Sequence, residues 1–157
     1  MKSDRMAALA VGCGGVLALT APALGAQGDT VKTGTYTGST LKLKVAKKSM
    51  SPSEVDQPVV KGECVISNTG ERSQTTFSIA AMKFKGKRPK IGIKSFRTIR
   101  IESKNPRGLP ETTNYKLTVK FSTAKKAKVT VEYKSKSTGT LGSTTCSGKA
   151  RDTVKRK

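Results

Sequence analysis

The chain of 157 residues contains no histidine and no tryptophan, and it has ten acidic residues against 31 lysines and arginines. The absence of histidine excludes Ser-His-Asp and Cys-His catalysis and removes the commonest general base. Three cysteines without any histidine are also too few for a tetrahedral metal site. We therefore expect a protein that is not an enzyme and that binds no metal and no cofactor.

Other catalytic patterns are scarce as well. Glycoside hydrolysis needs two carboxyl groups about 5–9.5 Å apart, and the closest distinctive pair in the sequence, Glu54 and Asp56, lies beside prolines in a predicted loop. Phosphate-binding glycine motifs are absent from the sequence. A small hydrolase with an unrecognised Ser-Lys dyad stays open as the weakest alternative.

Residues 1–25 have the three parts of a secretory signal peptide. Lys2 and Arg5 precede an apolar run from Met6 to Leu24, and small residues follow at a spacing that suits cleavage. A membrane anchor is one alternative, because about 19 apolar residues can span a bilayer, and lipidation of Cys13 is another. We predict cleavage, no membrane span after it, a linker over residues 26–32, and a secreted or cell-surface location.

Cleavage would leave Cys64 and Cys146 in a domain of about 132 residues whose formal charge is one less than the +21 of the whole chain. That length suits one domain. An even number of cysteines in an exported chain predicts one disulfide. Two buried free thiols are the alternative.

Apolar and polar residues alternate with a period of two in several runs of the mature region. This pattern is typical of half-buried antiparallel strands, and it places Lys42, Lys44, Lys116 and Lys120 on outward faces. The clearest runs are Leu41–Val45, Ile99–Ile101, Tyr115–Phe121 and Val129–Tyr133, and further candidates are Val59–Ser67, Thr75–Phe84, Ile91–Ile93 and Thr144–Arg151. We expect an all-β fold over residues 33–152, either a single antiparallel β-sandwich or a small β-barrel.

Two segments interrupt the alternation, Lys47–Pro58 and Ser103–Asn114, and both contain prolines and acids. We predict that they are exposed loops, which either bind a partner or are tolerated surface insertions. A protein-binding module or inhibitor that acts through one of them is the alternative function. The basic tail, residues 153–157, is expected to be frayed.

Three short motifs frame the domain: Thr33–Thr40, which contains G-T-Y-T-G, then Ser137–Leu141 (S-T-G-T-L) and Thr145–Lys149 (T-C-S-G-K). With these motifs the chain resembles a group of small exported β-rich proteins of soil actinobacteria, with a G-T-Y-x-G opening and a T-G-T-L…C-x-x-G-K ending. The resemblance covers about residues 33–157. It implies export and a β-rich fold, and it implies no activity.

The remaining feature is positive charge, which attracts polyanions. No acid occurs between Arg72 and Ile101, and the expected anion-contacting residues lie there: Lys83, Lys85, Lys87, Arg88, Lys90, Arg97 and Arg100. The alternative is a solvated lysine surface that keeps sheet edges from pairing.

Nucleic acid is not expected as a dedicated ligand. Rings such as that of Tyr115 should point into the core where the neighbouring lysines point out. We expect a monomer that adheres to anionic cell-envelope or extracellular polymers.

Overall fold

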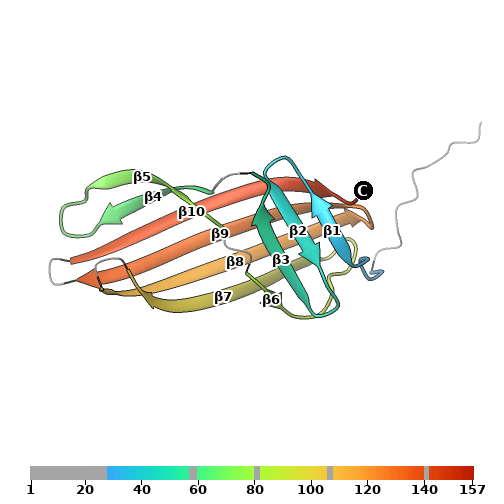
Figure 1. Cartoon of the computed structure of the whole chain (residues 1–157), viewed down its shortest axis with the longest axis horizontal. Helices are drawn as coiled ribbons and strands as arrows, with labels where there is room; N and C mark the ends of the chain where they lie inside the picture. Colours follow the sequence, from blue (N-terminus) through green and yellow to red (C-terminus); the bar gives the residue numbers. More distant parts are fainter. Residues whose placement is uncertain (1–27, 57–59, 80–81, 106–107, 140–141) are drawn as a thin grey trace, which may run out of the picture.

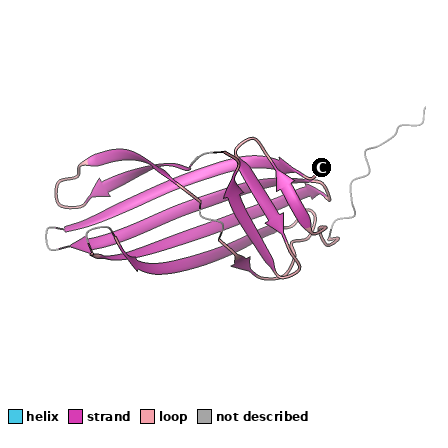
Figure 2. Cartoon of the chain, in the orientation of Figure 1, coloured by secondary structure: helices cyan, strands magenta, loops and turns pink. Residues whose placement is uncertain are grey.

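The computed structural model describes residues 28–56, 60–79, 82–105, 108–139 and 142–157. The predicted signal peptide, Cys13 and the first residues of the predicted linker lie outside these ranges. Within them the protein is all-β and antiparallel, without a helix, as the alternation predicts (Figure 2). The ten strands form one sheet that nearly closes into a barrel. In chain order they are β1 (Gly34–Thr37), β2 (Leu41–Val45), β3 (Ser49–Glu54), β4 (Val60–Ile66), β5 (Arg72–Phe77), β6 (Phe84–Lys85), β7 (Lys94–Lys104), β8 (Pro110–Thr123), β9 (Lys126–Gly139) and β10 (Gly142–Lys155).

Strand β10 connects the parts of the sheet. One of its edges pairs with β9 along the whole strand, from Gly142 to Lys155. Its other edge pairs first with β4 and then, at Lys155, with β1. The strand order is β6-β3-β2-β1-β10-β9-β8-β7, with the β4–β5 hairpin branching from β10. Figure 1 shows the long strands β7–β10 side by side. Strands β1–β3 cross them at one end, and the β4–β5 hairpin lies beside β10 at the other end.

The hydrophobic core lies where β1–β3 cover one end of the long strands. The alternating residues of β2 are buried against those of β8 and β9, and the ring of Tyr36 meets that of Phe121 edge-on at 5.2 Å. Of the four lysines predicted on outward faces, Lys44, Lys116 and Lys120 are exposed, and Lys42 is partly buried. The largest fully buried side chains are Tyr36, Phe84, Phe121, Leu41, Leu43, Met50, Leu117, Val31, Val45, Val60, Val119 and Val129.

A disulfide joins Cys64 in β4 to Cys146 in β10, which confirms the predicted pair. The two residues face each other in register, and their Cα atoms are 3.9 Å apart. The bond spans 82 residues of sequence, and a loop of that length corresponds to about 4.5 kcal/mol in the chain-entropy description. Most residues of β5 are exposed, so the disulfide fastens a hairpin that buries little apolar surface of its own.

Three predictions about irregular segments are wrong. Half of Lys47–Pro58 is strand β3, whose residues from Met50 to Glu54 pair with β2. Pro52 is tolerated because, within the described residues, β6 covers only Ser49 and Met50 and leaves the rest of β3 as an edge. In Ser103–Asn114, β7 continues to Lys104 and β8 begins at Pro110, and hydrogen bonds join Asn105 to Leu109 between them.

The tail is not frayed, since β10 reaches Lys155 and the side chain of Val154 is fully buried. The candidate strand Thr75–Phe84 is divided between β5 and β6. Ile91–Ile93 is a turn with a single bridge from Ile91 to Phe121. In each of these cases, residues distant in the sequence decide whether the segment pairs.

The carboxylate of Asp152 ties β10 to the turn between β1 and β2. It accepts hydrogen bonds from the amides of Thr40 (2.7 Å) and Leu41 (2.9 Å), and Gly38 leaves room for it, since a Cβ there would lie 2.2 Å from Oδ2. Burial alone would raise the pKa of the Asp152 carboxyl. These two amide bonds and one from Thr153 outweigh burial and hold the pKa below its usual value.

We expect Asp152→Asn to lower the free energy of unfolding by about 1–3 kcal/mol at pH 7, because two buried amides lose a charged acceptor. A carboxyl with a depressed folded-state pKa stabilises the fold above its ordinary pKa of about 4 and loses that contribution as the pH falls through the folded value. The difference between wild type and variant should therefore shrink below about pH 4. Urea unfolding from pH 7 to pH 2.5, with the exposed Asp56→Asn as control, measures it. A difference that is independent of pH would contradict this role.

Candidate anion-binding surface

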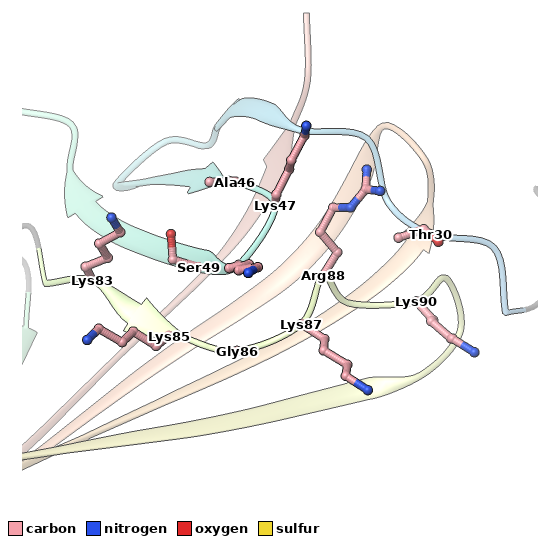
Figure 3. A pocket seen from close by; sticks show the side chains of 11 residues that line it. Thr30, Ala46, Lys47, Ser49, Lys83, Lys85, Gly86, Lys87, Arg88 and Lys90 are labelled. Carbon is pink, nitrogen blue, oxygen red and sulfur yellow. The ribbon is translucent and has the colours of Figure 1, made fainter.

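Seven cationic side chains gather around one hollow of about 1050 Å³, which we call the basic pocket (Figure 3). They come from the turn between β2 and β3, from β6 with the preceding Lys83, and from the loop that follows β6. The lining residues are Thr30, Ala46, Lys47, Lys48, Ser49, Lys83, Lys85, Gly86, Lys87, Arg88 and Lys90.

Pairing of β3 with β6 brings these segments together. Ser49 lies opposite Lys85 in register, and the amide of Gly86 donates to the carbonyl of Lys48 at 2.8 Å. The amide of Ala46 donates to the carbonyl of Ser49 at 2.9 Å and closes the turn that carries Lys47 and Lys48. The two lysines of this turn are thereby held beside Lys85 of β6.

The loop between β6 and β7 is fixed by its backbone while its charged side chains remain in water. Pro89 and Ile91 are buried, and Lys87, Arg88 and Lys90 are exposed. Besides the bond from Gly86 to Lys48, four backbone hydrogen bonds join the loop to other segments: Val31 N to Pro89 O (3.1 Å), Ile91 N to Asp29 O (2.9 Å), Gly28 N to Ile91 O (3.0 Å) and Gly92 N to Phe121 O (2.8 Å). The cations of the loop therefore start from defined backbone positions.

Arg97 links β7 to β6, the two strands at the ends of the strand order. Its guanidinium donates to the carbonyl of Phe84 at 2.9 Å and to the carbonyl of Lys87. Burial lowers the pKa of this guanidinium, whose ordinary value lies far above neutral pH. The group thus spans the seam between β6 and β7. It also holds the start of the loop that joins these strands, residues 86–93, which we call the basic loop.

The structure brings together five of the seven residues predicted to contact anions, namely Lys83, Lys85, Lys87, Arg88 and Lys90. The other two lie outside the basic pocket. Arg97 serves the seam, and Arg100 forms an exposed ion pair with Glu102 at 2.9 Å.

Sequence reasoning missed Lys47 and Lys48. The signal was there, since the two adjacent lysines directly follow the alternating run Leu41–Val45 and so sit where a turn is expected. The prolines and acids that follow them made the whole segment look like one loop.

The electrostatics of the basic pocket are one-sided, because none of its eleven lining residues is acidic. Figure 3 shows Lys47 and Arg88 extending to one side of the loop and Lys87 and Lys90 to the other. The charges surround the hollow and do not converge on one point. This arrangement suits an extended chain of anionic groups better than one small anion.

The outer face of β7–β10 is also basic, but it is interrupted by acids. Glu132 lies at its centre and contacts Lys149 at 2.5 Å and Lys116 at 3.9 Å. The hydrogen bond from Lys149 is the main reason why the pKa of Glu132 lies below its usual value, with burial acting in the opposite direction. The basic pocket, by contrast, has no carboxylate in its lining.

Within the described ranges, the structure has no helix that is long and apolar enough to cross a membrane. Neither a protein-family model nor a curated protein matches the chain. The resemblance to exported actinobacterial proteins remains a prediction.

We expect Arg97→Gln to lower the free energy of unfolding by about 1–3 kcal/mol, because it removes a charged donor shared by two carbonyls of the seam. Arg100→Gln is the matched control on the same strand, and loss of its exposed ion pair should cost less than about 1 kcal/mol. Denaturant unfolding of both variants measures the difference. Equal stability of the two variants would show that Arg97 does not hold the seam.

Proposed function

We propose that this protein is an exported, non-catalytic β-domain that binds anionic polymers of the cell envelope or extracellular matrix through the basic pocket. The observation that carries the proposal is the gathering of seven cations from three segments around a hollow with no acid in its lining.

Export is supported by two independent features. The first 25 residues have the composition of a signal peptide, and the disulfide between Cys64 and Cys146 belongs to the kind of bond that persists in oxidising compartments. Polymers met outside the cytosol include those with phosphate groups and those with carboxylate groups.

The chemistry of the cations favours charge density over a particular anionic group. Six of the seven are lysines, which act as hydrated point charges, whereas specific phosphate recognition favours the planar fork of arginine. A fixed array of such charges attracts a polyanion strongly at low salt, and screening weakens that attraction as salt rises. We therefore expect phosphate and carboxylate polymers to bind comparably.

The alternative functions have less support. The alternative of a protein-binding module needs an exposed loop at Lys47–Pro58 or at Ser103–Asn114, and half or more of each segment is strand. Glu54, one of the paired acids considered for a hydrolase, accepts hydrogen bonds from the hydroxyl of Ser78 and the amide of Ile79, which is a structural use of the carboxylate.

The test is retention of the disulfide-bonded protein on immobilised polyphosphate and on polygalacturonate. We expect retention at ~50 mM salt and release at ~1 M salt. The triple variant Lys47→Gln/Lys48→Gln/Lys83→Gln should bind at least about tenfold more weakly, which corresponds to about 1.4 kcal/mol.

The matched control is Lys128→Gln/Lys134→Gln/Lys136→Gln. It removes the same net charge from exposed positions of β9 outside the basic pocket. An equal loss of affinity in both triple variants would show that net charge alone drives binding and would contradict a site at the basic pocket. Retention unchanged at ~1 M salt would contradict the electrostatic basis itself.

A further inference from the structure

Two of the most exposed large hydrophobic side chains lie together beside the basic loop. Within the described residues, the exposed large hydrophobic side chains are Ile93, Phe96 and Ile101, which are 47 %, 56 % and 39 % exposed. Ile93 and Phe96 line one shallow hollow together with Lys85, Lys87, Arg88 and Lys90. Ile101 is not part of that hollow.

The exposure of this pair is built into the fold. Gly92 has a φ of +80°, and its amide donates a hydrogen bond to the carbonyl of Phe121. The backbone of the turn that precedes β7 is therefore fixed directly before Ile93. Phe96 lies opposite Thr118 in the register of β7 with β8. The next residue, Arg97, turns inward to the seam, and because side chains alternate along a strand, Phe96 must point outward.

Cations surround the two apolar side chains. The ammonium groups of Lys94 and Lys116 lie 5.0 Å and 5.6 Å from the centre of the Phe96 ring. The hollow itself is lined by five further cations and by no acid. The five are Lys85, Lys87, Arg88, Lys90 and Arg97. Exposed apolar side chains within a ring of cations are what an anionic bilayer surface accommodates, since the apolar groups enter the headgroup region while the cations contact the lipid phosphates.

We propose that this protein binds the surface of an anionic lipid bilayer through Ile93 and Phe96, with the cations beside them contacting the headgroups. This goes beyond polymer binding, because it needs the apolar side chains of Ile93 and Phe96, although the two hollows share Lys85, Lys87, Arg88 and Lys90. We call Ile93, Phe96 and the cations beside them the apolar patch. Through it the protein contacts the surface of the bilayer, as a peripheral membrane protein does.

Single-stranded nucleic acid is the competing ligand, because the ring of Phe96 and two cations share one accessible face, as base stacking requires. Phe96 differs in this respect from rings such as that of Tyr115, because its side chain is exposed. The bilayer is favoured because the patch has one ring, and its second apolar member, Ile93, has no flat face on which a base can stack.

The experiment uses vesicles of phosphatidylcholine, with and without about a third of phosphatidylglycerol, in a co-sedimentation assay at ~100 mM salt. We expect binding to the anionic vesicles only. Ile93→Ser/Phe96→Ser should weaken that binding by about tenfold or more, because the variant lacks the two apolar side chains that leave water on binding. Ile101→Ser, which removes another exposed isoleucine of β7 from outside the patch, should bind as wild type does. The same double variant should still be retained on polyphosphate, so failure of this proposal and failure of polymer binding are distinguishable.

The absence of tryptophan from the chain allows a direct readout of insertion. Phe96→Trp introduces a single reporter, and its fluorescence should shift to shorter wavelength when anionic vesicles are added, whereas that of Ile101→Trp should not. Equal binding to both kinds of vesicle, wild-type binding by the double variant, or no spectral shift would each overturn the proposal. Tight binding of a single-stranded oligonucleotide that Phe96→Ser abolishes and Ile93→Ser leaves intact would overturn it in favour of nucleic acid.

Discussion

The contact on which both candidate surfaces depend is the pair of hydrogen bonds from the Arg97 guanidinium to the carbonyls of Phe84 and Lys87. Strands β6 and β7 stand at opposite ends of the strand order, and this side chain spans the seam between them. The loop that joins these strands carries cations that line the basic pocket, and the same cations line the hollow that holds Ile93 and Phe96. One partly buried cation therefore positions several exposed ones.

The rest of the sheet supplies a support of uneven stability. At one end β1–β3 cover the long strands and enclose the core, and both candidate surfaces lie beside this end. At the other end most residues of β5 are exposed, and the β4–β5 hairpin is held by its pairing with β10, by the disulfide, and by Val60 and Phe77, which pack on the core. A fixed array of charge belongs at the end with the core, because loops on a packed core keep their backbone geometry.

The sequence was sufficient where the signal was local. Alternation predicted the strands that hold Leu41, Leu117 and Val129, and cysteine arithmetic predicted the disulfide. It failed where a partner distant in the chain decides the outcome. Pro52 is tolerated because β6 is too short to cover it, Arg97 looked like one more surface cation, and the outward direction of Phe96 follows from its register with β8. The basic pocket is assembled from segments far apart in the sequence, so composition could point only to the region.

The loop between β6 and β7 is held by its backbone to the core and is not a mobile charged loop. The amides of Gly86, Ile91 and Gly92 test this attachment most directly, because they donate to the carbonyls of Lys48, Asp29 and Phe121. Amide hydrogen exchange followed by NMR should show all three exchanging far more slowly than in an unstructured peptide. Exchange of all three at the rate of an unstructured peptide would show that the backbone of this loop is not held to the core.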